Sequence, residues 1–295
     1  MKTAFLKKLN LSLLNKFLSM KKIFFLCHLF FALCLNAQDI SIMTYNIKLD
    51  YPKEGENSWE NRKPFMLGQL QFYEPDIFGV QEAMPNQMKD LDSLLINYDF
   101  VGVGRDDGFN QGEYSAIFYN NNKFKVLNSS TFWLSQTPDK VSMGWDAVCN
   151  RVCTYALFEN LNTGNRFYVF NTHFDHVGVE ARKNSAILIL KKVADINTEN
   201  HPVVLMGDFN MEEGHESIQY ITKHLNDSKA ISKLQPFGPT GTFNGFNFHE
   251  PVTNRIDFIF VSSEISVEKY VVLSDSKDCK YPSDHLPVLI LAKII

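Results

Sequence analysis

Short runs of hydrophobic residues recur along the whole chain, and many of them are bounded by Gly, Pro, Asn or Asp. Apolar runs between such residues are typical of buried β-strands. The pattern predicts strands at Ile40–Leu49, Ile77–Gln81, Phe100–Val103, Ser115–Tyr119, Thr154–Phe158, Phe167–Thr172, Val203–Met206, Ile256–Val261, Tyr270–Leu273 and Val288–Ala292.

Helical periodicity is found in fewer segments. Pro64, near the start of the first of them, suits a first helical turn. Strands that outnumber helices over both halves of the chain favour two packed sheets with helices outside. We therefore predict an α/β fold, a four-layer α/β sandwich with two mixed sheets. The predicted helices are Lys63–Tyr73, Gln87–Leu95, Glu180–Ile196 and Ser217–Leu225.

The N-terminal segment has the pattern of a secretory signal peptide. From Met20 it combines two lysines, an apolar run that ends at Leu35, and a small-residue site before Gln38. We predict cleavage near Ala37/Gln38 and export to the periplasm or the medium, with residues 1–19 upstream of the true translation start. An amphipathic helix on a membrane surface is the alternative for this segment.

The remainder, residues 38–295, is predicted to form one domain. The chain has 295 residues, of which 45% are hydrophobic, and it contains no repeats or Gly/Ser linkers. Residues 1–37 hold six lysines and no acidic residue, so the remainder has 23 basic against 33 acidic residues, a net charge of −10 rather than −4. A domain this acidic lacks the broad basic surface of an avid nucleic-acid binder.

Three cysteines remain in this domain, Cys149, Cys153 and Cys279. On one extended segment, Cys149 and Cys153 would be about 13 Å apart, which is too far for a disulfide. No CxxC pair or Cys/His cluster indicates a zinc site. We therefore expect the hydrophobic core to hold the fold.

Polar side chains follow several predicted strands at the point where each strand ends. In "VVLMGDFN" the residues Asp208 and Asn210 are separated by one position, so both would point to the same side of a strand. The other polar strand ends are Asn46, Gln81-Glu82, His173 with Asp175 and His176, Asp257, and Asp284-His285. If these ends converge, they form a cluster of carboxylates, histidines and carboxamides.

Such a cluster is suited to phosphate-ester chemistry. Oxygen ligands are preferred by Mg²⁺ and Mn²⁺. Hydrolysis of a phosphate ester needs a cation to neutralise charge, an oriented water, and a proton route to the leaving oxygen. A histidine held by an aspartate can provide that route, because the carboxylate fixes the tautomer and raises the pKa of the imidazole.

The motifs "TYNIK", "QEA", "NTHFDH", "GDFN", "RIDFIFVS" and "SDHLPV", in this order, resemble the endonuclease/exonuclease/phosphatase superfamily over residues 40–293. The chain is most similar to a bacterial secreted subgroup related to the carbon-catabolite-repressor/nocturnin group. The resemblance implies a four-layer α/β sandwich. It also implies a Mg²⁺- or Mn²⁺-dependent hydrolase of phosphate esters, whether phosphodiesterase, nuclease or phosphatase.

The resemblance further implies roles for the strand-end residues. Glu82 would be the principal metal carboxylate, with Asn46 beside it and Asp284 completing the metal region. Asp208 would orient or activate the attacking water, and Asn210 would contact the phosphoryl oxygen.

Two histidines complete the implied site. His285 would contact the scissile phosphate, paired with Asp257, and His173 would face the phosphate or the leaving group. The alternatives are structural: a turn former at Asn46, a helix N-terminal charge at Glu82, and a structural histidine at His285.

Substrate contacts are predicted from further segments shared with the subgroup, including "SWENRKP", "VGVGRDDG", "GEYSAIFY" and "RVCTYALF". Arginine suits bidentate phosphate contact, and a structural ion pair is its alternative role. Aromatic residues in Gly/Asn-rich segments could stack on a base, a sugar ring or a lipid head group, or simply pack. Asn244 stands where the family usually has a histidine. The candidates are Arg62, Arg105, Arg151, Tyr114, Trp59, Phe109, Trp145, Phe243 and Phe246.

We expect a phosphorylated substrate, which could be a nucleic acid, a phospholipid, an inositol phosphate or a phosphorylated glycan. The absence of a long apolar hairpin from the sequence counts against a sphingomyelinase. A monomer without a stable protein partner is expected. The alternative function is a binding-only or toxin-like module that keeps the fold without turnover.

Overall fold

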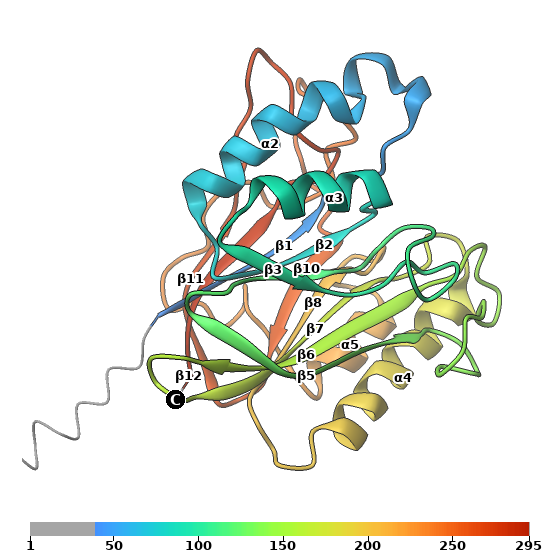
Figure 1. The fold of residues 1–295 in the computed structure, drawn as a ribbon, viewed down its shortest axis with the longest axis vertical. Coiled ribbons are helices and arrows are strands. Elements are labelled where there is room, and N and C mark those ends of the chain that lie inside the picture. The colour runs from blue at the N-terminus through green and yellow to red at the C-terminus, as the bar shows by residue number, and fades with distance from the viewer. Residues whose placement is uncertain (1–38, 295) are drawn as a thin grey trace, which may run out of the picture. The chain divides into compact units, whose positions relative to one another are not determined.

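Two sheets form the frame of the protein in this computed structural model, which describes residues 39–294 (Figure 1). The first sheet has the strand order β11-β12-β1-β2-β4-β3, and the second has the order β5-β6-β7-β8-β10-β9. The first contains β1 (Ile40–Asn46), β2 (Ile77–Gln81), β3 (Tyr98–Val101), β4 (Ile117–Asn120), β11 (Ile265–Val272) and β12 (Val288–Ile294). The second contains β5 (Phe124–Trp133), β6 (Val152–Asn160), β7 (Arg166–His173), β8 (Val203–Asp208), β9 (Asn226–Asp227) and β10 (Asp257–Val261).

Helices cover the outer faces of both sheets. The short 3-10 helix η1 (Pro52–Asn57) leads into α2 (Trp59–Tyr73), which lies with α3 (Pro85–Leu94) on the first sheet (Figure 1). On the second sheet, α4 (Val179–Ile196) and α5 (Glu216–Thr222) pack on the opposite side of the molecule. The predicted four-layer α/β sandwich with two mixed sheets is confirmed.

Three hydrophobic clusters separate these four layers. In β1, Ile40 and Ile42 face the second sheet, whereas Met43 and Tyr45 face α2 and α3. Alternate side chains of a strand point to opposite faces, so a strand with a layer on each side must be apolar throughout. This is the reason why the central strands appear in the sequence as largely apolar runs.

The edge of the second sheet was not predicted. Strand β5 carries exposed polar residues such as Asn128, Ser129 and Ser130, and its pairing with β6 shifts register between Val126 and Asn128. An edge strand with one solvated face lacks the apolar run by which the central strands are recognised.

The first helix also begins earlier than predicted. It starts at Trp59, so Pro64 lies inside α2 rather than in its first turn. No helix within residues 39–294 is long and apolar enough to cross a membrane. The three cysteines of this part are free thiols, as expected for the Cys149 and Cys153 pair. The predicted signal segment lies outside the described residues.

Each sheet contains one parallel pair of strands, β1 with β2 and β7 with β8. The carboxyl ends of parallel strands meet at one edge of a sheet. Asn46 is paired with Gln81 at that edge of the first sheet, and His173 is paired with Asp208 at that edge of the second. Strand β10 runs antiparallel to β8 and begins there, which pairs Asp257 with Asp208.

A buried polar contact joins the two sheets beneath this edge. Asn171 of β7 donates to the carbonyls of Val80 and Ala116 and accepts a hydrogen bond from Gln81 Nε2 at 2.6 Å. Gly79 makes the approach possible, since a Cβ atom there would lie 2.6 Å from the Asn171 side chain. The contact fixes the relative register of the sheets and thereby the spacing of the polar strand ends above it.

Candidate active site

A cavity of about 570 Å³ opens at the edge where these strand ends meet. Polar and charged side chains dominate its lining, which combines strand ends with several loops. The lining residues are Lys48, Leu49, Glu82, Arg105, Glu113, Val148, Cys149, Arg151, His173, His176, Asp208, Asn210, Phe243, Ile256, Asp284 and His285.

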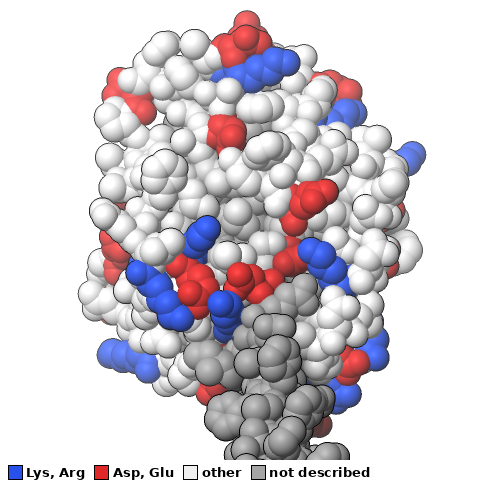
Figure 2. Space-filling view, turned by 90° about the vertical axis from the view of Figure 1, so that its left-hand side faces the viewer, with Lys and Arg blue, Asp and Glu red and all other residues white. Residues whose placement is uncertain are grey.

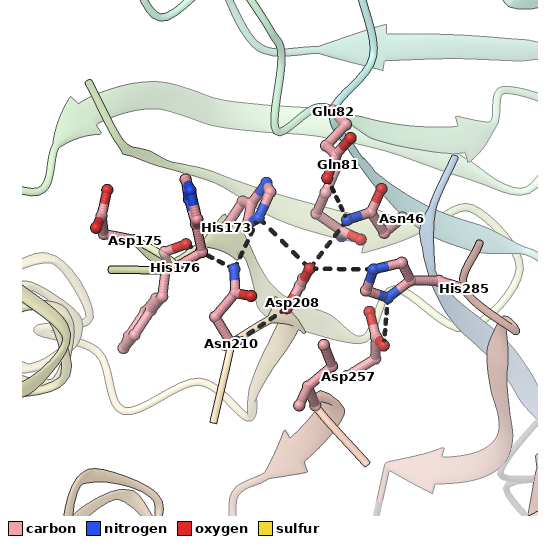
Figure 3. A network of polar contacts seen from close by, with 12 residues as sticks. Asn46, Gln81, Glu82, His173, Asp175, His176, Asp208, Asn210, Asp257 and His285 are labelled. Carbon is pink, nitrogen blue, oxygen red and sulfur yellow. Dashed lines mark hydrogen bonds and ion pairs between the residues drawn. The ribbon is translucent and has the colours of Figure 1, made fainter. Parts of the chain in front are cut away.

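Asp208 lies at the centre of the polar network. Figure 3 shows it between His173 and His285, with Asn46 and Glu82 on the side of the first sheet. Asp208 Oδ2 accepts a 2.9 Å hydrogen bond from Asn46 Nδ2 and lies 3.4 Å from His173 Nε2 and 3.7 Å from His285 Nε2. Burial, and then the charge of Asp257, raise the pKa of Asp208 to about 7. A carboxylate with such a pKa is suited to take a proton from water near neutral pH.

Asn210 reaches the site by a different route from the one predicted. It lies beyond the end of β8 in the left-handed region, with φ of 51°. Its main-chain N–H donates to Asp208 Oδ1 at 2.9 Å. The two side chains therefore share one side because of this tight turn, and not because of strand alternation.

Asn46 connects the two sheets at the site. Its Nδ2 donates both to Asp208 and to Glu82 Oε1, the latter at 3.1 Å, while its Oδ1 accepts from the Lys48 main chain. The side chain is fully buried behind the cavity lining. These contacts place the carboxylates of Glu82 and Asp208 next to each other, so Asn46 positions both. Its predicted role as a metal ligand stays a prediction.

His285 is held by Asp257 at the other side of Asp208. His285 Nδ1 lies 2.8 Å from Asp257 Oδ2, and Thr242 Oγ1 donates to the same carboxylate oxygen. Burial opposes a charged imidazole, but Asp257 and Asp208 more than offset it and raise the pKa of His285 to about 10. The ring is therefore an imidazolium at neutral pH, with Nε2–H directed toward Asp208. The predicted pairing of Asp257 with His285 is present.

His173 is the neutral counterpart of His285. Burial, followed by the charges of Arg151 and Arg105, lowers the pKa of His173 well below its usual range. Asn210 Nδ2 lies 3.0 Å from His173 Nε2 and also donates to the Phe174 carbonyl. This orientation of the amide makes Nε2 the acceptor, so Nδ1 carries the proton. Both amide hydrogens of Asn210 are then in use, and a direct contact with a phosphoryl oxygen would require one of them to be released.

The acidic residues beside Asp208 fit a hard divalent cation. Glu82 adopts a φ of 61°, and Leu49 N–H donates to its Oε2. Lys48 Nζ lies 3.8 Å from Glu82 Oε2 and 3.4 Å from Asp284 Oδ2, so positive charge is already stabilised between these two carboxylates. Burial opposes ionisation of Glu82, but Lys48 and His285 hold its pKa below the usual range. An ionised, oxygen-only donor set of this kind is suited to Mg²⁺ or Mn²⁺.

A second group of possible ligand atoms lies deeper. One atom each of Asp208, Asp257 and His285 falls within 4.8 Å of the others. The contact between His285 Nδ1 and Asp257 already occupies two of these groups. The described residues thus offer a possible metal site. The carboxylate oxygens of Glu82 and Asp284 are more available to a metal ion than the atoms of this deeper group, which are already paired with each other.

Arginine residues lie on the His173 side of the cavity. We call Arg105, Glu113, Cys149, Arg151 and His176 the arginine side. Arg105 Nη1 donates to Glu113 Oε2 at 2.7 Å, and Arg151 Nη2 lies 3.0 Å from His176 Nδ1. Both guanidinium groups line the cavity, and their predicted contact with a substrate stays a prediction.

Two predicted substrate contacts are corrected by the structure. Arg62 is buried away from this cavity and donates to the main-chain carbonyls of Asn57, Ile47, Pro282 and Lys48. Tyr114 packs among the residues under α2 and α3, and its hydroxyl donates to the Phe109 carbonyl. Both side chains therefore hold loops in place.

The aromatic candidates also mostly lie elsewhere. Trp145, with φ of 49°, is not part of the cavity lining, and Trp59 is fully buried with its Nε1–H donated to Asp90. Phe243 does line the cavity, where its ring packs edge-on against His285 at a centroid distance of 5.1 Å. Asn244 donates to the Ser283 carbonyl and so positions the loop that carries Asp284 and His285.

Several lining residues were not selected from the sequence as site residues. Lys48 is a charged residue in a loop, and nothing in its own neighbourhood distinguishes it from a solvated surface charge, although it follows the strand end at Asn46. For the pair Glu113-Tyr114, the sequence leaves open which residue faces the site, and Glu113 is the one that lines the cavity.

Comparison with known proteins agrees with this geometry. A model of the Endonuclease/Exonuclease/phosphatase family matches residues 43–285. The structure of a mannosyl-6-phosphatase from Bacteroides thetaiotaomicron is 38% identical, with a TM-score of 0.83, and the match covers 86% of this chain and 99% of that chain.

Eukaryotic relatives match more weakly and only in part. Nocturnin of Rattus norvegicus is 24% identical over 286 residues, which cover 85% of this chain and 64% of nocturnin. The Ccr4 3'-5'-exoribonuclease subunit of the CCR4-Not complex from Emericella nidulans is 26% identical over 163 residues, which cover 45% of this chain and 24% of that protein. With a family model matched over most of its length, the chain belongs to the endonuclease/exonuclease/phosphatase family.

Proposed function

We propose that this protein is a divalent-metal-dependent hydrolase of phosphate esters, with Mg²⁺ or Mn²⁺ as the cofactor. The observation that carries the proposal is the position of Asp208. This buried carboxylate, whose pKa is raised to about 7, lies 3.7 Å from the imidazolium of His285 and 3.4 Å from the neutral ring of His173. A buried base next to a charged proton donor, His285, is suited to proton transfer during turnover, and this supports hydrolysis over simple binding.

The residues divide the reaction among them. Asp208 accepts the proton of the attacking water. His285, held as an imidazolium by Asp257, donates to a phosphoryl oxygen, and His173 Nδ1–H offers a second, uncharged donor. Glu82 and Asp284 would hold the divalent cation, with Asn46 orienting Glu82. When bound, the cation neutralises charge that develops on the phosphoryl and leaving oxygens.

We propose a phosphorylated sugar as the substrate class. The mannosyl-6-phosphatase relative supports this choice, because its chain is matched almost completely. A cavity of about 570 Å³ lies in the range of small-molecule sites, which is roughly 300–1,000 Å³. Phospholipids and inositol phosphates have no comparable support among the relatives described above.

Nucleic acid is the second candidate substrate. It is supported by the exoribonuclease relative, although that match covers less than half of this chain. The acidic composition disfavours it, since long polyanions bind through extended basic surfaces. On the face shown in Figure 2, Lys and Arg side chains lie among Asp and Glu side chains and do not form a basic patch.

A substrate panel tests the proposed function. The secreted form would be incubated with mannose 6-phosphate, p-nitrophenyl phosphate, inositol phosphates, phospholipids and single-stranded RNA, with Mg²⁺ or Mn²⁺ and with a chelator. We expect metal-dependent release of phosphate, fastest from the sugar phosphate. Absence of turnover on the whole panel would instead support the binding-only module.

We also propose that the protein is an exported monomer. The support is the signal pattern from Met20 to Ala37. Intact-mass measurement of the secreted protein should give an N-terminus near Gln38, and a species that retains Met20 would contradict export by this signal. Light scattering would check the monomer.

A further inference from the structure

Arg151 has N–H donors that no described residue accepts. Its side chain is 6% exposed and lines the cavity. One nitrogen, Nη2, lies 3.0 Å from His176 Nδ1, whereas Nε and Nη1 have no hydrogen-bond partner among the described residues. Leaving buried N–H groups unpaired carries a desolvation penalty, so a site that retains them is prepared for an acceptor from outside the chain.

The surrounding carboxylates do not use these donors. Asp175 Oδ2 is 3.7 Å from Arg151 Nε, which is too long for a hydrogen bond. Both Asp175 oxygens already accept main-chain N–H groups, from Val148, Val177 and Gly178. The carboxylate therefore balances the charge of Arg151 and leaves its Nε–H and Nη1–H groups without an acceptor among the described residues.

Arg105 repeats this arrangement at the same side of the cavity. Its Nη1 is paired with Glu113 at 2.7 Å, whereas its Nε has no partner among the described residues. The Trp133 indole N–H donates to the Arg105 carbonyl at 2.8 Å and anchors the loop that carries it. Each of the two guanidinium groups thus keeps at least one N–H that no described residue accepts.

The arginines lie next to the reaction centre. The antiparallel register of β6 with β7 pairs Cys153 with Thr172, which places Arg151 beside the residues that follow His173. His173 in turn lies 3.4 Å from Asp208. A phosphate bound over Asp208 and His285 would therefore have its remaining oxygens on the His173 side, facing the arginines.

We propose that Arg151, assisted by Arg105, binds the unesterified oxygen that a phosphate monoester has and a diester lacks. This inference rests on the proposed hydrolase function and specifies its substrate as a monoester. A monoester carries about −1.5 to −2 charges at neutral pH and three terminal oxygens. In a diester one of these oxygens bears a second substituent, which removes a charge and blocks its contact with the guanidinium N–H groups.

Two substrates that differ only in this oxygen test the proposal. They are p-nitrophenyl phosphate and methyl p-nitrophenyl phosphate, which share one leaving group and carry no other anionic group. The ratio of their kcat/KM values would be measured for the wild type, Arg151→Gln and Arg105→Gln. We expect Arg151→Gln to lower the monoester-to-diester ratio on the order of 10²-fold, and Arg105→Gln on the order of tenfold.

A matched control is Arg166→Gln, an exposed arginine paired with Glu159 at the far end of β7. Its ratio should equal that of the wild type. A ratio that stays within threefold of the wild type in Arg151→Gln would overturn the proposal, because a merely structural arginine would weaken both reactions together. Arg151→Lys keeps the charge and loses the planar guanidinium group. Its monoester-to-diester ratio should fall between those of the wild type and Arg151→Gln.

A binding measurement decides the question without turnover. Calorimetry with monomethyl phosphate and dimethyl phosphate would be run on the same variants, with circular dichroism to check their folding. The wild type should prefer monomethyl phosphate, and Arg151→Gln should lose at least tenfold of that preference. Failure of hydrolysis with this preference intact would contradict the proposed function only, whereas equal binding of the two ligands by the wild type would contradict the role of Arg151.

Discussion

The two sides of the cavity are built in different ways. We call Lys48, Glu82, Asp208, Asp284 and His285 the carboxylate side. Asp208 and Glu82 stand at or directly beyond strand ends of the two sheets, and their oxygens accept hydrogen bonds from Asn46 and from main-chain N–H groups. On the arginine side, loops carry the guanidinium groups, and several of their N–H donors have no acceptor within residues 39–294.

This difference fits a division of tasks in which the carboxylate side carries out proton transfer and the arginine side binds the substrate. A proton-transfer group must be held within a fraction of an ångström, which paired strands achieve better than loops. The strands at this edge are in fixed register, so His173, Asp208 and Asp257 lie side by side across β7, β8 and β10. The loops on the other side can change without disturbing this arrangement, because the strands hold it.

The largest effect should come from removing the base of the carboxylate side. Asp208→Asn keeps the shape of the side chain but cannot accept the proton of the attacking water. We expect kcat to fall by about 10²–10⁴, the range for a proton-transfer group. Steady-state kinetics on the best substrate of the panel would measure this. The exposed Asp139→Asn is the control, and a loss of less than tenfold in Asp208→Asn would remove Asp208 from the role of base.

The second prediction tests whether Asp257 and His285 act as one unit. His285→Ala should lower kcat by about 10²–10³, as for other donors to a developing oxyanion. Because Asp257 acts by holding His285, adding Asp257→Asn to that variant should cost little more. A double variant whose losses multiply would show independent roles, and Asp257 would then be reassigned to the deeper group of possible metal ligands.

A smaller loss is expected at Glu82. Glu82→Gln keeps the shape and removes one ligand charge, so Mg²⁺ or Mn²⁺ affinity should fall by about tenfold or more. Calorimetric titration with the metal alone measures this without any substrate. Thermal stability should change little, because the core does not depend on the ion. Equal metal affinity in variant and wild type would move the metal site away from Glu82.

The central strands and the residues at their ends could be predicted from the sequence. β8 is apolar on both faces, so its end is marked by its first polar side chain, Asp208, and the largely apolar β1 likewise ends at the carboxamide of Asn46. Strand ends converge because of sheet geometry, and sheet geometry follows from local pattern. The edge strand β5 was not predicted, because one of its faces is solvated and its sequence therefore lacks an apolar run.

The arginines show where sequence reasoning stops. Arg62 and Arg151 have the same chemistry and similar burial. The N–H groups of Arg62 donate to main-chain carbonyls, including that of Pro282, which is 220 residues away. Arg151 instead keeps two nitrogens, Nε and Nη1, without an acceptor among the described residues. Partners that distant are set by the packing of loops, and no local pattern encodes them. The distinction between a structural and a substrate-facing arginine therefore required the structure.

The smallest predicted effect concerns the anchor of the arginine side, Asp175. Its carboxylate accepts three main-chain N–H groups and faces Arg151 and the Cys149 thiol, while Arg182 donates to its carbonyl. Asp175→Asn replaces one acceptor oxygen by a donor, so we expect a loss of about 1–3 kcal/mol in the free energy of unfolding at pH 7. Chemical denaturation would measure it, with the exposed Asp139→Asn as a control that should change stability by less than about 1 kcal/mol.

This loss should depend on pH. Burial alone would raise the pKa of Asp175, but the N–H groups of Gly178, Val177 and Val148, together with Arg151, hold it below the usual value. A depressed pKa in the folded state stabilises the protein above the unfolded pKa of about 3.9, and this contribution disappears as the pH falls through the folded pKa. The difference between wild type and Asp175→Asn should therefore be full at pH 7 and shrink steadily below about pH 4. A difference that stays constant down to pH 3 would show that the ionised carboxylate does not anchor the arginine side.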